Sequence, residues 1–459
     1  ILISADSARP VVLGSIERRP DDYLIKPFSQ VQLKSRISRA WSKRQYLGDV
    51  YREIANDNLN TAVDICEDLL ASPSPYRGSC EQLLVELYWQ LEQPDKALDV
   101  LTPYLDGKPI MWAQVALGKT YVHLQQYDKA MDMAEQVLKR NRFSAEAQDI
   151  LAQASDAKQQ GELAISAIRQ AIKLSPFSLP RHFHACEIAR NHDDYLLAAE
   201  SSFAIWDLSK RTVHYDCLHW CGYIRSLLDV AEYTDDKRTR NKYQQEALLA
   251  LQRGKFDEYL HRLDEDFDVE IFGRIMNARV NAIDGKMLDA KKHLVRSQWA
   301  IEEKYQTPPI AFIPDSIKVM YDLGEFEDAL KLQEVLKNSE GNLDPNSRFL
   351  LSKEQHNSKQ NFANYQQFNR EGIKYYQQGK YEQAKAAFAL AQGFAPVNTG
   401  VTLNLLQCLL QLLLKSDKPS REMMLECRKL FKLIDDMPLK QQHAEKYQTL
   451  RQELDQIIG

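Results

Sequence analysis

Apolar positions divide this chain into a short first part with strand-like runs and a long remainder with helical spacing. The runs "ILIS" (1–4) and "YLIK" (23–26) have the length of buried strands, and a loop and short helix are expected between them over 6–19. A helical pattern begins at Val31. The order β-α-β-α predicts parallel strands covered by helices. Because two strands alone do not form a stable sheet, we expect strands upstream or support from elsewhere in the chain.

An alanine recurs at nearly constant intervals through the helical remainder. Ala62, Ala97, Ala130, Ala164 and Ala198 follow one another 33 to 35 residues apart. A period near 34 is typical of helix-turn-helix repeats, in which small residues let two helices approach and large residues fill the gaps. The pattern resembles the tetratricopeptide repeat (TPR) family, and it predicts a mainly α fold, a TPR-type α-α superhelical solenoid.

Further positions carry the same resemblance. "LGKTY" precedes Ala130, and "EGIKYY" precedes a unit that ends at a proline. The positions expected to pack the repeats are Ala97, Leu117, Gly118, Tyr121, Ala130, Ala164, Pro176, Gly372, Tyr375, Ala384, Phe388 and Pro396.

The array is interrupted in two places. No clean unit lies between Ala198 and Ala290, and 337–364 is polar with little periodicity, which suits a partly helical, mobile linker. The expected parts are residues 1–40 as an α/β segment, 31–56 as a connecting helix, 57–336 as TPR-like repeats, 337–364 as an irregular linker, and 365–459 as C-terminal repeats and capping helices.

The connecting segment carries a stripe of mostly apolar residues. They are spaced alternately by four and three positions, with Arg44 as the one break, and comprise Leu33, Ile37, Ala40, Leu47, Tyr51 and Ile54. This spacing predicts an unbroken helix from Val31 to about Asn56. The stripe either forms a rigid signal-transmitting helix and dimer seam, or packs only against its own sheet and first repeat; both interpretations stay open.

The second strand-like run ends in Lys26 and Pro27. An ammonium at the carboxyl edge of a parallel strand can stabilise a phosphoryl group, and a following proline can hold a cis bond that aims it. A lone lysine at a strand end more often only reaches for solvent. Here, Ser4 and Ala5 end the preceding run and an aromatic residue, Tyr23, opens the second.

Together these residues resemble the C-terminal part of a bacterial response-regulator receiver domain, a CheY-like α/β fold, over residues 1–40. The resemblance implies that Lys26 contacts an acyl phosphate, that Ser4 hydrogen-bonds it, and that Tyr23 is a rotameric switch. It also implies a cis peptide between Lys26 and Pro27. The order of the two parts resembles receiver–TPR regulators of the VieB type.

The acidic pocket and acceptor aspartate of that family lie on earlier strands and are not in this sequence. Whether the receiver is phosphorylated is therefore open, and Mg²⁺ is expected only with the upstream part. The chain begins with Ile1 rather than methionine, so the natural N-terminus is expected to lie upstream.

Charge and composition narrow the function classes. A net charge of −5 argues against broad nucleic-acid binding. The most apolar run, 402–414, is interrupted by polar residues and fits a buried helix rather than a membrane span. Seven cysteines without a Cys-x-x-Cys pair suit a reducing cytoplasm.

No constellation for catalysis or metal binding stands out. His214, Cys217 and Cys221 share one helical face, but a fourth zinc ligand is not evident and core packing is the better interpretation. No nucleophile motif or phosphate-binding glycine loop is present. We therefore expect no enzyme.

These features predict a response regulator of a two-component phosphorelay whose output is protein–protein interaction through a TPR scaffold. The expected partner in the groove is a sensor histidine kinase or another regulator, with no nucleic acid and no membrane. A homodimer through the receiver and connecting helix stays open. The alternative is a constitutive TPR adaptor whose receiver only docks or dimerises, and an enzyme controlled by a receiver is a third hypothesis without catalytic residues to support it.

Overall fold

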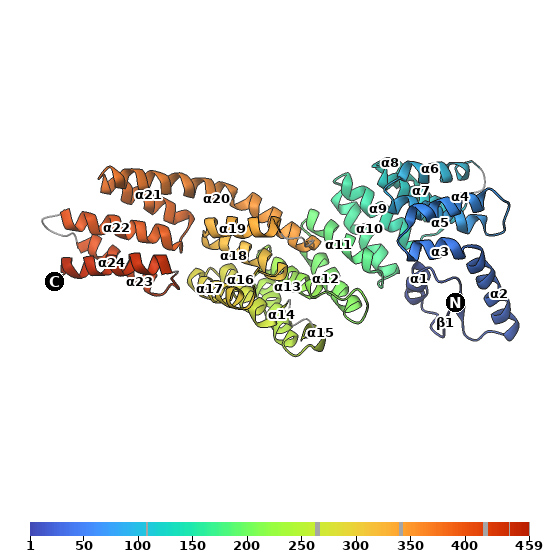
Figure 1. Cartoon of the computed structure of the whole chain (residues 1–459), viewed down its shortest axis with the longest axis horizontal. Helices are drawn as coiled ribbons and strands as arrows, with labels where there is room; N and C mark the ends of the chain where they lie inside the picture. The colour runs from blue at the N-terminus through green and yellow to red at the C-terminus, as the bar shows by residue number, and fades with distance from the viewer. Residues whose placement is uncertain (107–108, 262–266, 339–342, 416–420, 440, 459) are drawn as a thin grey trace. The chain divides into compact units, whose positions relative to one another are not determined.

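The computed structural model describes residues 1–106, 109–261, 267–338, 343–415, 421–439 and 441–458. The chain divides into two compact units, Ile1–Ser209 and Lys210–Gly459 (Figure 1). Each unit is built from helices that pack against their sequence neighbours, which is the arrangement of a TPR-like solenoid.

Unit 1 begins with the predicted parallel strand pair. β1 (Leu2–Ser4) pairs with β2 (Tyr23–Ile25) so that Leu2 lies opposite Tyr23 and Ser4 opposite Ile25, and α1 (Arg9–Glu17) connects the strands. The Lys26–Pro27 peptide is cis, as the receiver resemblance implies. Leu24 is the one buried strand residue, which agrees with the expectation that this small sheet needs support from elsewhere.

The predicted unbroken connecting helix is wrong, because two helices occupy that segment. α2 (Gln30–Tyr46) starts at a capping box formed by Ser29 and Gln32, and α3 (Gly48–Ala55) follows after a break at Leu47, where φ is −99° and ψ is 12°. Leu47 is fully buried among the repeats, whereas Trp41 on α2 is exposed. The residues of the stripe pack into the repeat core only from Leu47 onward. The chain therefore bends at the residue where the stripe joins that core.

Five helix pairs then form the repeats of unit 1. The second helix of each pair carries one of the period-34 alanines, and all five alanines are 0 or 1% exposed. The prediction that nearly everything after Val31 is α-helix is confirmed. The pairs are α3 with α4 (Leu59–Leu70), α5 (Arg77–Gln90) with α6 (Pro94–Leu101), α7 (Met111–His123) with α8 (Tyr127–Arg140), α9 (Ala145–Ala157) with α10 (Gly161–Leu174), and α11 (Leu179–Asn191) with α12 (Tyr195–Ser209); the 3₁₀ turn η1 (Thr102–Tyr104) follows α6.

The turn inside each pair contains one residue in the left-handed region, with φ between 55° and 61°. In unit 1 these residues are Asp57, Glu92, Gln125, Gln159 and Asp193. Glycines take this place in three turns of unit 2, at Gly285, Gly324 and Gly379. The left-handed position reverses the chain so that the second helix packs back on the first.

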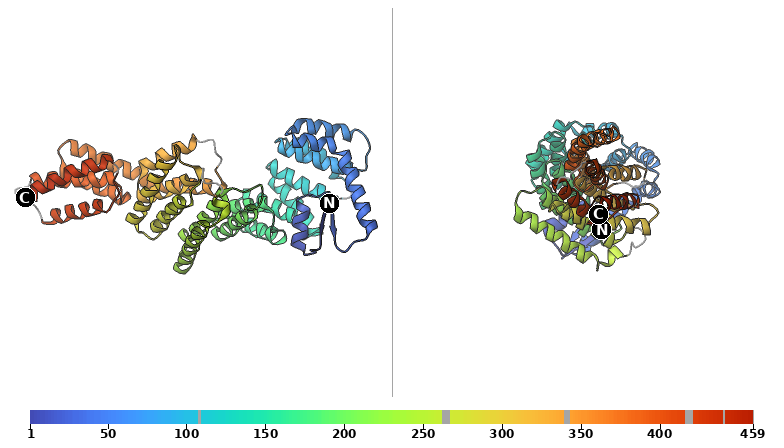
Figure 2. Two further views of the ribbon diagram at one scale, coloured as in Figure 1. Left: turned by 60° about the horizontal axis from the view of Figure 1, so that its bottom comes forward. Right: turned by 90° about the vertical axis from the view of Figure 1, so that its left-hand side faces the viewer.

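Unit 2 continues with helix pairs and ends in three helices. Its elements are α13 (Cys217–Glu232), α14 (Lys237–Gly254), α15 (Glu258–His261), α16 (Val269–Ile283), α17 (Met287–Lys304), η2 (Ile310–Phe312), α18 (Ile313–Leu323), α19 (Phe326–Lys337), α20 (Pro345–Gln377), α21 (Tyr381–Phe394), α22 (Thr399–Lys415), α23 (Arg421–Asp435) and α24 (Gln441–Ile458). Helices α18 to α24 follow the orange-to-red part of Figure 2.

The predicted irregular linker at 337–364 is also wrong over most of its length. Residues 339–342 lie outside the described part of the chain, and α20 runs without interruption from Pro345. Asp344 caps this helix by accepting a hydrogen bond from the Ser347 amide, and the proline occupies its first turn. The segment shows weak apolar periodicity because several of its inward contacts are polar; one is the 3.0 Å ion pair of Glu354 with Lys318.

Candidate protein-binding groove

The first helices of the unit 1 repeats form a common surface. Helices α5, α7, α9 and α11 contact one another in order, and side chains of the first three line a shallow hollow. Its walls combine aromatic rings with both signs of charge, from Glu86 and Trp89 on α5, Trp112 and Lys119 on α7, and Glu146 on α9. Such a surface suits a protein segment better than a small molecule. We call it the unit 1 groove.

Helix α1 lies against the end of this groove. It packs on α10, and the views of Figures 1 and 2 show the dark-blue helix beside the cyan-green helices of the array. Gly14 is the buried residue of α1, and a Cβ there would lie 3.5 Å from the Cβ of Phe177. The array therefore supplies the support that the small sheet lacks.

Arg181 of α11 is the polar centre of this contact. Its side chain is 2% exposed, and its Nη2 lies 2.6 Å from Oε1 of Glu17 and 2.7 Å from Oδ2 of Asp149. Nε donates to Asp149 Oδ1 at 2.8 Å, and Nη1 donates to the carbonyl of Ser175 at 2.7 Å and to Glu17 Oε2 at 3.2 Å. The Ser175 hydroxyl also donates to Glu17 at 2.5 Å. One arginine thus binds a carboxylate of the array and a carboxylate of α1.

Further charges flank this centre. Arg19, just after α1, forms an ion pair with Glu86, and Lys119 lies 2.9 Å from Glu146. The guanidinium of Arg9, at the other end of α1, lies 3.8 Å from the ring centroid of Phe143, a cation–π contact. Both ends of α1 are therefore held by side chains of the array.

The pKa values of the groove carboxylates reflect these neighbours. Burial raises the pKa of Asp149, Arg181 opposes the shift, and the nearby charge of Glu17 adds to it. Burial also acts to raise the pKa of Glu146, but the charge and hydrogen bond of Lys119 outweigh it, so that pKa is lowered. The pKa of Asp149 thus depends on the buried Arg181, and the pKa of Glu146 on Lys119, which lines the groove.

The residues of the receiver resemblance gather at one edge of the strand pair. The Lys26 amide donates to the Ser4 carbonyl at 2.9 Å, which holds the two strand ends together. Ser4 Oγ accepts from the Asp6 amide at 3.0 Å, and the Tyr23 hydroxyl donates to the Asp6 carbonyl at 3.3 Å. The Lys26 side chain is exposed at this edge, as are Ala5 and Pro27, the other two residues of the resemblance.

The predicted TPR packing residues lie mostly inside the two units. The buried ones are Ala97, Leu117, Gly118, Tyr121, Ala130, Ala164, Gly372, Ala384 and Phe388, while Pro176 and Tyr375 are half-buried and Pro396 is exposed. A Cβ on Gly372 would lie 2.7 Å from the Phe388 ring, so α20 and α21 approach closely there.

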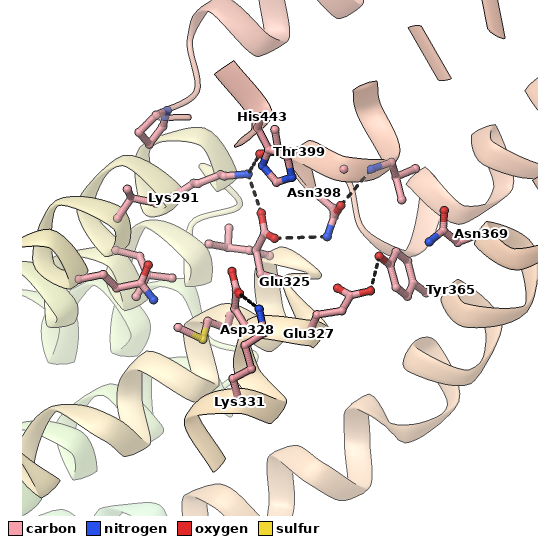
Figure 3. A pocket seen from close by; sticks show the side chains of 18 of the residues that line it. Lys291, Glu325, Glu327, Asp328, Lys331, Tyr365, Asn369, Asn398, Thr399 and His443 are labelled. Atoms are coloured by element: carbon pink, nitrogen blue, oxygen red, sulfur yellow. Dashed lines mark hydrogen bonds and ion pairs between the residues drawn. The ribbon is translucent and has the colours of Figure 1, made fainter. Parts of the chain in front are cut away.

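A second hollow, of about 320 Å³, lies within unit 2 between α17, α19, α20 and α22 (Figure 3). At its floor, Lys291 is 4% exposed and its ammonium donates to Glu325 at 2.6 Å, to Thr399 Oγ1 at 2.7 Å and to the carbonyl of Val397. On the wall, Tyr365 donates to Glu327 at 2.8 Å. Because the lysine's three N–H groups are used within the chain, we interpret it as a tie between helices.

Unit 2 also contains a buried network of charges. Arg225, Arg279 and Asp315 are each 0 or 1% exposed, and Asp315 lies 2.6 Å from Arg225 and 3.3 Å from Arg279. Asp229 and Glu232 bind Arg279 from α13. The network joins α13, α16 and α18, and because each of its carboxylates is paired with an arginine we assign it to the fold rather than to a site.

The described part of the chain contains neither of two other kinds of feature. Among those residues, no group of histidines, cysteines and acids is arranged to hold a metal ion. Within the same ranges, no helix is both long and apolar enough to cross a bilayer.

Sequence reasoning missed the groove residues that matter most. Arg181 stands in "RHFHAC", and Glu17 lies 164 positions before it. Neither residue belongs to a repeat position or a motif, so the sequence offers no signal that could have paired them.

Comparison with known proteins supports the repeat array. The tetratricopeptide repeat family model matches residues 115–178, which covers most of α7 and all of α8 to α10. No curated protein matches. The chain contains tetratricopeptide repeats, and such repeats are scaffolds for protein–protein interaction.

Several solved structures resemble the chain weakly. A MamA RS-1 double mutant has 20% identity, covering 36% of this chain and 93% of its own, with a TM-score of 0.30. A tetratricopeptide repeat protein from Parabacteroides merdae has 11% identity, covering 65% and 100%, with a TM-score of 0.33. The Cut9–Hcn1 tetramer of APC/C has 11% identity, covering 89% and 96%, with a TM-score of 0.32. Similarity this low indicates nothing about function.

Proposed function

We propose that this chain is the output part of a response regulator, in which an N-terminal receiver segment controls a TPR scaffold that binds a signalling protein. The supporting observation is the placement of Ser4 and Lys26 at one edge of a parallel strand pair. A hydroxyl and an ammonium at the carboxyl ends of adjacent parallel strands can bind the oxygens of a phosphoryl group. Mg²⁺ belongs to this proposal only together with acidic residues upstream of Ile1.

The partner is a sensor histidine kinase or a second regulator, bound in the unit 1 groove. The chain offers a half-buried surface of aromatic and charged side chains there, which is the composition of protein-binding surfaces. The receiver segment touches the same array through α1, so a change in the segment can alter access to the groove.

The input is tested on the natural protein by calorimetry with beryllofluoride and Mg²⁺. Lys26→Ala is expected to weaken binding of this phosphoryl mimic at least about tenfold, since a charge-assisted contact of this kind is worth roughly 1.5–3 kcal/mol. Lys34→Ala, an exposed lysine on α2, is the matched control and is expected to leave binding unchanged. Equal binding by wild type and Lys26→Ala would refute the phosphoryl-sensing role.

The output is tested by affinity capture from cells of the source organism, followed by titration of the captured kinase or regulator. We expect its affinity to change about 5- to 150-fold with beryllofluoride, the range of ordinary allosteric coupling. Loss of this difference, with binding retained, favours the second candidate.

That second candidate is a constitutive adaptor whose receiver segment only docks. The ion pair of Glu17 with the buried Arg181 favours it, because such a contact can hold α1 without any phosphoryl signal. The same titration distinguishes the two, since an adaptor binds its partner equally with and without the mimic.

A further inference from the structure

We propose that the unit 1 groove contains a seat for the end of a short helix, in which a glutamate closes the last turn and an arginine follows two residues later in the turn beyond it, and that α1 with Glu17 and Arg19 is its occupant within the chain. Arg181 and Ser175 bind the glutamate, and Glu86 binds the arginine two residues later. The inference rests on the proposed function only in taking this groove as the partner surface. The partner it fits is a protein helix that ends in such a glutamate and is followed by such an arginine.

The seat is built independently of its occupant. Asp149 holds the Arg181 side chain through Nε and Nη2, and the Ser175 carbonyl takes a third N–H. None of these partners belongs to α1. If α1 leaves, the guanidinium keeps its position, and the N–H groups that faced Glu17 are left directed at the groove. A buried, pre-oriented arginine of this kind binds a carboxylate through two parallel hydrogen bonds.

Glu86, the second charged residue of the seat, determines in which direction a ligand can bind. Arg181 lies on α11 and Glu86 on α5, so a ligand must present its carboxylate toward α11 and its cation toward α5. A helix inserted in the reverse direction would place like charges together, which disfavours it. The chain's own segment satisfies both positions with residues two apart.

The contact that holds α1 is partly polar and partly apolar. Ile16 is 51% exposed, Val11, Val12 and Leu13 are half-buried, and Gly14 is the helix's one buried residue, so α1 is only partly withdrawn from solvent. Such a contact is weak in trans but persists within one chain, because tethering raises the effective concentration to about the millimolar range. A partner that matches the same charges and adds apolar contacts can therefore displace α1.

The experiment measures binding of a fluorescent peptide with the sequence of residues 8–20 to the whole chain. Wild type is expected to bind it weakly, because α1 occupies the seat. Glu17→Lys places a cation against Arg181, which should release α1 and increase peptide affinity at least tenfold. A peptide with lysine in place of its glutamate is the control and is expected not to bind either protein.

An engineered disulfide can hold α1 in the seat permanently, which is the opposite of its release in Glu17→Lys. Gly14 and Phe177 would place their Cβ atoms 3.5 Å apart, within the range of a disulfide, so Gly14→Cys with Phe177→Cys can lock α1 in place. Cys217→Ser serves as the background, since that thiol is partly exposed. The oxidised protein is expected to lose peptide binding, and reduction should restore it.

The results of these experiments can contradict the proposal in two ways. Equal peptide affinity for wild type, Glu17→Lys and the oxidised lock would overturn the seat, and so would absence of binding to Glu17→Lys with an unchanged circular dichroism spectrum. If Glu17→Lys fails to fold, the oxidised and reduced lock decide the matter alone. A failed beryllofluoride test with these results intact would overturn only the response-regulator function.

Discussion

Asp322 shares one ammonium with two other carboxylates. Lys318 Nζ lies 2.8 Å from Asp322 and from Glu232, and 3.0 Å from Glu354. Burial raises the pKa of Asp322 to about 6, the neighbouring carboxylates add to this shift, and Lys318 opposes it. Three carboxylates around one ammonium favour a proton on Asp322 up to about pH 6.

This arrangement predicts that the stability of the folded protein decreases as the pH rises. The folded protein holds the Asp322 proton up to about pH 6, whereas the unfolded chain releases it near 3.8. Its contribution to stability is therefore full below pH 3.8 and is lost as the pH rises through about 6. Asp322→Asn removes this titration, so its stability relative to wild type should be higher at pH 7.5 than at pH 5.

Urea unfolding of unit 2 at the two pH values measures the effect. We expect the difference between variant and wild type to shift by on the order of 1–2 kcal/mol, since each pKa unit is worth about 1.4 kcal/mol. Asp436→Asn, an exposed aspartate of the same unit, is the control. A difference that does not change with pH would show that Asp322 is ionised at both values.

The residue scale is also where the sequence was least informative. The alanine period located residues that pack between neighbouring helices, because the same spacing recurs in each repeat. Glu17 and Arg181 meet through the fold and not through any repeat, and buried acids such as Asp315 look like ordinary surface acids in the sequence. Pairings across long separations have no period to reveal them.

At the scale of elements, the sequence predicted helices better than their ends. Asp344 and Pro345 are a recognisable helix start, yet the polar composition that follows outweighed them in the prediction of a linker. The break at Leu47 lacks such a signal, since Leu47 continues the apolar stripe. It arises from tertiary packing, which periodicity alone cannot anticipate.

The turns inside the helix pairs permit a matched test. Gly324 and Gly285 have φ values of 75° and 76°, so alanine at either site adds the cost of a left-handed residue, roughly 1–2 kcal/mol. At Gly324 the new Cβ would also collide with the backbone of Ala395, whereas nothing lies within 4 Å of it at Gly285.

We therefore expect Gly324→Ala to destabilise unit 2 more than Gly285→Ala, by about a further 1–3 kcal/mol for the overpacked contact. Thermal and urea unfolding of both variants measure this difference. Equal losses would mean that the approach of the α18–α19 turn to the Ala395 segment is looser than the structure indicates.

At the scale of the whole molecule, the division into two units sets how far a local defect spreads. The charges that surround Arg279 come from α13 and α18, all within unit 2. In repeat arrays, stability depends on each repeat and its neighbours, so two arrays in one chain need not unfold together. The sequence placed one interruption after Ala198, close to the boundary at Ser209, because the alanine period is lost there.

Arg279→Met tests this division. The variant removes the buried arginine that pairs with Asp229 and leaves Asp315 with Arg225 alone, a loss that costs about 3–5 kcal/mol. Hydrogen exchange followed by mass spectrometry is expected to show lost protection in 210–459 and unchanged protection in 1–209. Arg274→Met, an exposed position on the same helix α16, is the control and should change neither unit. Equal loss of protection in both units would mean that the chain unfolds as one cooperative body, and the boundary at Ser209 would then have no energetic meaning.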